Sequence, residues 1–244
     1  DLDRPLSEAE REGFRARVAR RRRHEPIAYI LGEKEFWGRD FYVGPAVLVP
    51  RPDSETIVER ALALLPRDAE GPVLDLCTGS GCVAVAIAKN VPEALVAATD
   101  VSAKALEVAG RNVARHGLDS RVQLREGNLF APVDQAQDAG GFDLIVSNPP
   151  YVTDAEMSAL DPNVREYEPS LALQAGPRGL DILEPLVAQA ADFLTGQGVL
   201  MLEIGYRQGP DVSALLEAAE RFKPARTIPD HQGHDRIIIA ERSC

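Results

Sequence analysis

The sequence has no long apolar run, few cysteines and little aromatic character. Among its 244 residues, no apolar run approaches the roughly 18 needed to cross a bilayer, so we expect no membrane segment. The first residues are highly charged, unlike a signal peptide, and lack a starting Met, so we expect further chain upstream. Only three cysteines occur, Cys77, Cys82 and Cys244, without metal-ligand spacing. A reduced, cytoplasmic environment is the simplest interpretation.

The sequence also has no excess of positive charge. Lys and Arg total 27 against 38 Asp and Glu, which gives a net charge of −11. This balance argues against broad adhesion to nucleic acid, which depends on neutralising phosphates. The exception is a group of seven arginines between Arg11 and Arg23, on a segment whose pattern predicts a helix over 7–23. That group is interpreted either as a solvated helix face or as a contact for an acidic or RNA-rich partner.

From residue 73 onward, short apolar segments alternate with helical patterns. Strands are predicted at 73–77, 95–99, 122–124, 144–146, 199–204 and 236–240, and helices at 82–89, 102–116, 181–194 and 211–222. Repeated β-α units predict an α/β fold, with a mostly parallel sheet covered by helices on both faces. Ligands of such sheets bind at the carboxyl ends of the strands.

Two less regular regions flank this pattern. Alternation at 40–43 and again at 46–49 predicts a short hairpin or linker, and a helix follows with its apolar stripe between Ile57 and Leu65. The segment 148–180 is rich in proline and has little periodicity. A loop of that length in a compact domain usually carries function.

A glycine-rich loop follows the predicted strand at 73–77. Gly79, Gly81 and Ala84 have the spacing of a dinucleotide fold, and Asp100 ends the next strand, where an acid can accept both ribose hydroxyls. This pattern predicts a nucleoside-type cofactor without separating NAD from S-adenosylmethionine. Asp75 before the glycines favours the latter, because its methionine part carries an ammonium group, whereas a pyrophosphate would gain nothing from an acid there.

The most discriminating motif is Asn148-Pro149-Pro150-Tyr151, directly after a predicted strand. The two prolines fix the backbone, remove two N–H donors and leave carbonyls free to accept. With the Asn148 side-chain oxygen they form a rigid group of acceptors suited to a planar –NH2 group. Acceptors at this position also favour the positive charge that develops on nitrogen when it is alkylated.

Taken together, these motifs resemble those of the HemK/PrmC family, the release factor glutamine methyltransferases, among the class I S-adenosylmethionine-dependent methyltransferases. Further matching segments lie at 25–32, 35–37, 49–55, 168–169, 172–173, 202–205 and 235–236. The resemblance implies a Rossmann-like, seven-stranded methyltransferase domain at 51–244. It further implies a partial helical substrate-docking domain at 1–35 and a hairpin linker at 36–50.

The resemblance also implies which residues act. Those that would bind S-adenosylmethionine are Asp75, Cys77, Thr78, Gly79, Ser80, Gly81, Asp100, Asn128, Leu129 and Asn148. Those that would hold the glutamine of a Gly-Gly-Gln loop in a peptide chain release factor, and so catalyse its methylation, are Asn148, Pro149, Pro150 and Tyr151. Phe36 and Arg51 would border the substrate pocket.

Two positions depart from the family pattern. Cys77 stands where many members have Gly, which is acceptable if its backbone has an ordinary conformation. Asn128 stands where Asp is usual; its oxygen can still accept from an adenine amine, but its –NH2 cannot.

Other functions remain as alternatives. A ribosomal-protein glutamine methyltransferase, or a DNA or RNA amino-methyltransferase, would share the Asn-Pro-Pro-Tyr chemistry. The sequence shows no separate basic target-recognition domain, which argues against a DNA or RNA amino-methyltransferase. An NAD-dependent oxidoreductase would explain the glycines and Asp100 but leave Asn148 to Tyr151 unused. No metal site is predicted, because His231 and His234 have no third ligand nearby. For Glu203, a role facing the site and a structural ion pair are both open.

Overall fold

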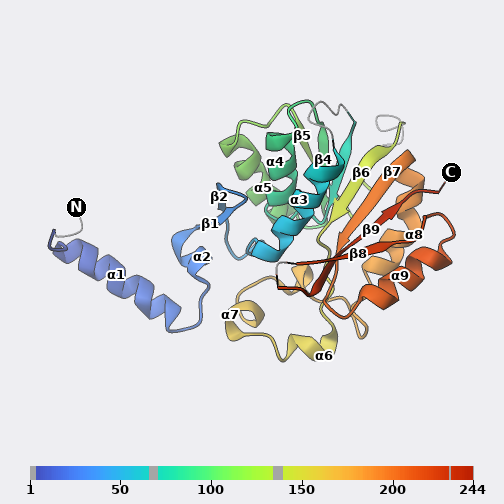
Figure 1. Ribbon diagram of the computed structural model, residues 1–244. Coiled ribbons are helices and arrows are strands. Elements are labelled where there is room, and N and C mark those ends of the chain that lie inside the picture. Colours follow the sequence, from blue (N-terminus) through green and yellow to red (C-terminus); the bar gives the residue numbers. More distant parts are fainter. Residues whose placement is uncertain (1–3, 66–70, 134–139, 231, 244) are drawn as a thin grey trace.

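A single mixed sheet forms the centre of the molecule in the computed structural model, which describes residues 4–65, 71–133, 140–230 and 232–243. Its strand order is β5-β4-β3-β6-β7-β9-β8 (Figure 1). The strands are β3 (Val73–Leu76), β4 (Val96–Asp100), β5 (Val122–Glu126), β6 (Phe142–Ser147), β7 (Leu194–Glu203), β8 (Arg226–Pro229) and β9 (Asp235–Glu241). The first five strands in that order are parallel, and β9 runs antiparallel to β7 and β8. The predicted seven-stranded, mostly parallel sheet is therefore confirmed.

Helices cover both faces of the sheet. Figure 1 shows α3 (Glu55–Leu64), α4 (Cys82–Asn90) and α5 (Ala103–Arg115) on one side, with α8 (Leu183–Phe193) and α9 (Gly209–Ala218) on the other. Successive strand residues point to opposite faces. Two apolar clusters therefore form: on β6, for example, the side chains of residues 144 and 146 join the α3 and α4 cluster, whereas residue 145 joins the α8 and α9 cluster.

The N-terminal helix extends away from the sheet (Figure 1). α1 (Glu8–Arg21) begins at a capping box: the Ser7 hydroxyl accepts from the Glu10 N–H, and the Glu10 carboxylate accepts from the Ser7 N–H. The predicted helix and its cap are confirmed. None of its residues is buried. A short helix, α2 (Ile27–Leu31), follows and joins a small cluster with residues 43, 47 and 49.

The hairpin lies earlier in the chain than predicted. Its strands are β1 (Glu33–Phe36) and β2 (Arg39–Tyr42), which pair antiparallel, and residues 46–49 are not a strand. The two connecting residues, Trp37 and Gly38, have φ angles of 51° and 68°. A two-residue hairpin turn needs such positive φ values, and Trp gives little sign of one in a sequence. The prediction therefore paired the wrong segments.

Four further elements, in two regions of the chain, were not predicted. The long segment after β6 contains three single-turn helices: α6 (Asp154–Met157), α7 (Pro162–Arg165) and the 3₁₀ turn η2 (Ser170–Ala172). These are too short to show a helical period. The edge strand β8 has four residues, none of them buried, so no apolar pattern marks it. Among the described residues, no helix combines the length and apolar character needed to cross a membrane.

The strand order determines where side chains gather. The chain passes from β3 outward to β4 and β5, then returns to place β6 on the other side of β3. The carboxyl ends of β3, β4 and β6 thus meet at the point where the strand order reverses, which is where α/β sheets of this type bind ligands.

One buried amide joins the hairpin, α5 and the glycine loop. Asn112 is fully buried; its Nδ2 donates to the Tyr42 carbonyl at 3.0 Å and to the Ser80 carbonyl at 2.8 Å, and its Oδ1 accepts from the Tyr42 N–H at 2.7 Å.

Asn112→Ala would leave these backbone groups without a partner. We expect a loss of about 3 kcal/mol in the free energy of unfolding, measured by urea denaturation. The matched control, Glu107→Ala on the exposed side of α5, should cost less than about 0.5 kcal/mol. Equal losses in the two variants would contradict this role.

Candidate active site

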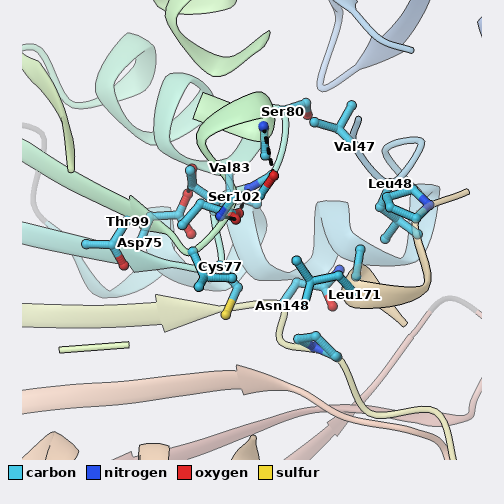
Figure 2. Close-up of a pocket in the computed structure, with 18 of the residues that line it drawn as sticks. Val47, Leu48, Asp75, Cys77, Ser80, Val83, Thr99, Ser102, Asn148 and Leu171 are labelled. Atoms are coloured by element: carbon cyan, nitrogen blue, oxygen red, sulfur yellow. Dashed lines mark hydrogen bonds between the residues drawn. The ribbon is translucent and has the colours of Figure 1, made fainter. Parts of the chain in front are cut away.

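A cavity opens at the carboxyl ends of β3, β4 and β6 and holds about 1090 Å³ of space, part of it open to solvent (Figure 2). Eleven of the residues singled out from the sequence line it: Arg51, Asp75, Cys77, Thr78, Gly79, Ser80, Asp100, Asn128, Leu129, Asn148 and Pro150. These come from several separate parts of the chain. The order of the strands in the sheet brings them together at the carboxyl ends, where the sequence predicted the ligand site.

Asp75 is a buried carboxylate in the wall of this cavity. Its Oδ2 accepts from the Thr78 hydroxyl at 2.6 Å and from the Ala84 N–H at 3.2 Å. Burial raises the pKa of the Asp75 carboxyl to about 7, although both donors act in the opposite direction. The carboxylate is thus held at the start of α4, where a cationic ligand group would favour its ionised form.

Asp100 closes the glycine loop from the end of β4. Its Oδ2 accepts from the Gly79 N–H at 2.9 Å, and its Oδ1 accepts from the Ser102 N–H at 2.9 Å. Burial raises the pKa of this carboxyl too, and the two N–H donors lower it. Each oxygen retains a second lone pair, so the group can also accept from a pair of hydroxyls.

The Cys77 backbone does not have the ordinary conformation that we expected at this position. Its φ is 59°, in the left-handed region, which costs an L-residue with a side chain roughly 1–2 kcal/mol. Gly79 and Gly81 nearby also have positive φ values, of 56° and 77°. The loop therefore requires three left-handed residues within five positions, which explains why glycine suits position 77.

Just after the end of β5, Asn128 and Leu129 line the cavity together with the exposed Val101. Leu129 is also left-handed, with φ of 48°, and its carbonyl accepts from the buried Thr99 hydroxyl at 3.4 Å. These residues form a cavity wall with apolar surface and one side-chain amide, which is the kind of surface that binds the planar base of a nucleoside.

Asn148 lines the cavity at the end of β6, beside Cys77 at the end of the adjacent strand β3 (Figure 2). Its Nδ2 donates to the Ser54 hydroxyl at 3.0 Å, and Ser54 donates to Glu203 at 2.6 Å. The Tyr151 hydroxyl donates to the other oxygen of the same Glu203 carboxylate at 3.0 Å. Neither Ser54 nor this chain of hydrogen bonds was identified from the sequence, although Ser54 belongs to the segment 49–55 that carried part of the resemblance.

Four predicted site residues do not line the cavity. Phe36 was expected to border the substrate pocket, but it is 1% exposed and packs edge-on against Phe41 in the core, which corrects that expectation. Gly81 precedes α4, and a side chain there would meet the Cβ of Ala109 at 3.2 Å, so this glycine permits close packing of α4 on α5. Pro149 is buried, and Tyr151 packs against the cluster beneath α8 and α9 rather than forming a wall of the cavity.

The segment before α3 also contributes to the cavity, through Val47, Leu48 and Arg51. The Arg51 guanidinium pairs with the buried Glu168 carboxylate at 2.5 Å, and Glu168 also accepts from the Val49 N–H at 3.0 Å. Glu168 thereby joins this segment to the long segment after β6, whose Leu171 lines the cavity. The only sequence feature that could have indicated these cavity-lining residues is the apolar character of the two loops. Loop residues have no helical or strand periodicity, so the sequence did not identify them.

Thiol and metal chemistry have no support among the described residues. Burial raises the pKa of both Cys77 and Cys82 to about 12, so both thiols are protonated at neutral pH and are poor nucleophiles. In the part of the chain that the structure describes, no group of three His, Cys, Asp or Glu side chains could hold a metal ion. His231 and Cys244 lie outside the described residues.

Comparison with known proteins identifies the family. The family model of the methyltransferase small domain matches residues 58–163, and that of the PrmC N-terminal domain matches residues 1–32. The release factor glutamine methyltransferase of Geobacter sulfurreducens is 45% identical, over 98% of this chain and 81% of its own length. The enzyme of the same name from Gloeobacter violaceus is 43% identical, over 95% of this chain and 80% of its own.

Solved structures agree with the fold. A methyltransferase from Pyrococcus furiosus superposes with a TM-score of 0.62, covering 96% of this chain and all of that one, at 21% identity. A release factor-specific protein-(glutamine-N5) methyltransferase from Alicyclobacillus acidocaldarius has a TM-score of 0.51 and 29% identity, covering 84% of this chain and all of its own. By its sequence relatives and its sheet, the chain belongs to the release factor glutamine methyltransferase family.

Proposed function

We propose that this protein transfers a methyl group from S-adenosylmethionine to the side-chain amide nitrogen of the glutamine in the Gly-Gly-Gln motif of peptide chain release factors, and so modulates translation termination. The observation that carries this proposal is the position of Asn148, an amide held by Ser54 on the wall of the cavity that Asp75 and Asp100 also line. One cavity therefore offers a nucleoside-binding loop and an acceptor for an –NH2 group.

The residues present fit S-adenosylmethionine. Asp75 suits the ammonium of its methionine part, Asp100 the ribose hydroxyls, and Asn128 with Leu129 the adenine. The buried carboxylate of Asp75, next to the glycine loop, would repel the pyrophosphate of NAD. The alternative of an oxidoreductase therefore lacks support. When bound, the cofactor supplies a methyl group on a positively charged sulfur.

The residues of the chain act on the substrate by positioning it. The Asn148 oxygen accepts one N–H of the glutamine amide. The second acceptor in this proposal is the carbonyl of Pro149, although Pro149 is buried and does not line the cavity. Gripping both N–H bonds orients the nitrogen lone pair, and acceptors stabilise positive charge that develops there. Proximity and orientation of this kind can lower a barrier by up to roughly 7–11 kcal/mol. The proton leaves to solvent after the transfer.

The N-terminal residues belong to the same proposal. We assign residues 1–35 to part of a helical domain that docks the release factor, 36–50 to a linker and 51–244 to the methyltransferase domain. Four arginines of α1, Arg11, Arg15, Arg17 and Arg21, are exposed and suit an acidic surface on the partner. A cytoplasmic location and the lack of direct, sequence-specific binding to nucleic acid remain part of this proposal.

The proposal is tested by mass spectrometry of the Gly-Gly-Gln peptide after a release factor is incubated with the protein and S-adenosylmethionine. We expect one methyl group on the glutamine. Asn148→Ala should lower kcat by about 100-fold, the size of loss seen when one preorganised polar contact to a reacting group is removed. Its Kd for S-adenosylmethionine should rise less than about tenfold, because at most one neutral hydrogen bond to the cofactor is lost.

The matched control is Asn90→Ala, at the end of α4, where the amide bonds only to the Ala86 carbonyl among the contacts described. This variant should methylate at the normal rate. A ribosomal-protein fraction is assayed in parallel. Methylation there and not on the release factor would overturn the assigned substrate, and an Asn148→Ala variant with normal kcat would overturn the assigned role.

The pKa of Asp75 gives a second prediction. The ammonium of S-adenosylmethionine binds the ionised carboxylate, so affinity is present above the Asp75 pKa of about 7 and is lost as the pH falls through it. Between about pH 7.5 and about pH 6 we expect Kd, measured by calorimetry, to rise about eightfold. Asp75→Asn should bind weakly at both pH values and show no such change. Affinity that is constant or increases on acidification in the unmodified protein would contradict this contact.

A further inference from the structure

A buried carboxylate lies behind Asn148, and the proposed reaction does not use it. Glu203 ends β7 and is 1% exposed, and Ser54, which precedes α3, is 3% exposed. Ser54 stands between the two, bonded to Glu203 at 2.6 Å and to Asn148 at 3.0 Å. Three parts of the chain, at positions 54, 148 and 203, thus form one line of hydrogen bonds that ends at the cavity.

The directions of these hydrogen bonds are fixed by the number of protons available. An ionised carboxylate only accepts, so Ser54 must give its single hydroxyl proton to Glu203. The 2.6 Å separation is that of a charge-assisted O–H···O⁻ bond. The Ser54 oxygen is then only an acceptor toward Asn148, so Asn148 must turn its –NH2 to Ser54. Its Oδ1 is left for the cavity.

Burial raises the pKa of Glu203 on balance, but several neighbouring groups act against it and favour the ionised form. Burial raises the pKa of Glu203, whereas the Ser54 and Tyr151 hydroxyls and the charge of Arg236 lower it and Asp53 raises it. Arg236 is itself held between Asp53, at 3.4 Å, and Asp230, at 3.2 Å. Two hydroxyl donors and the nearby charge of a guanidinium therefore offset part of the cost of burying this carboxylate.

We propose that Glu203 and Ser54 are positioning residues that hold the Asn148 amide with its oxygen toward the cavity, so that the site selects a primary amide over a carboxylate. This inference rests on the proposed function and adds the origin of its selectivity. With the opposite orientation, Asn148 would present an –NH2 group, which repels the –NH2 of glutamine and donates to a carboxylate. The Ser54 hydroxyl proton, which is donated to Glu203 and does not contact the ligand, thus determines whether the site prefers glutamine or glutamate.

The test measures binding rather than turnover. A release factor with Gly-Gly-Gln and its counterpart with Gly-Gly-Glu are titrated by calorimetry into the protein loaded with S-adenosylhomocysteine. The unmodified protein should bind the glutamine form more tightly. In Ser54→Ala the amide loses its acceptor and can turn either way, so the ratio of the two Kd values should fall by about tenfold, the worth of one hydrogen bond. Glu203→Gln can donate to Ser54 and should lower the ratio in the same direction.

The control is Thr56→Val, a substitution of nearly equal shape two residues from Ser54. Thr56 is buried, and its hydroxyl has no hydrogen-bond partner among the described residues, so the ratio should not change. A merely structural role of Ser54 and Glu203 would weaken both complexes equally, and an unchanged ratio in Ser54→Ala would overturn the inference even if Glu203→Gln failed to fold. If the unmodified protein binds neither release factor, the proposed function itself fails.

Discussion

The neighbouring position of β3 and β6 brings the two halves of the site together. In sequence, β4 and β5 separate these strands, but in the sheet they pair in parallel, with Leu76 opposite Ser147. Cys77 and Asn148 directly follow this pair, so the glycine loop and the Asn-Pro-Pro-Tyr segment leave the sheet side by side. Any ligand held by the first segment is then presented to the second.

Buried carboxylates at these strand ends are tolerated because other elements supply their donors. Asp75 receives the Thr78 hydroxyl of the glycine loop and an N–H from α4, the partly buried Asp100 receives two N–H groups, and Glu203 receives two hydroxyls. A buried charge without such partners would cost several kcal/mol. The same bonds that offset this cost also fix the positions of the groups around the cavity, so stability and preorganisation have one origin.

The sheet was largely predictable because its strands are apolar and its helices periodic. The glycine loop, Asp100 and Asn148 were predictable because they follow strands directly. Phe36 was misplaced because an aromatic residue near a motif gives no sign of which face of its strand is buried. The left-handed backbone of Cys77 was missed because the residue type argues against it. Ser54 and Glu203 are 149 positions apart, and no local pattern indicates that their side chains meet.

The chemistry of the cavity follows from which groups it lacks as well as from those present. Among the described lining residues, no Lys or His is found, and both thiols are protonated at neutral pH. Its carboxylates, Asp75 and Asp100, already accept from the glycine loop and its neighbours. An amide nitrogen needs no base before it is alkylated, since it becomes acidic only afterwards. For such a substrate the barrier is lowered by orientation, and orientation requires an acceptor that cannot turn, because a rotating amide would offer a donor half of the time. A site that methylates amides therefore needs a fixed Asn148 more than it needs a catalytic base.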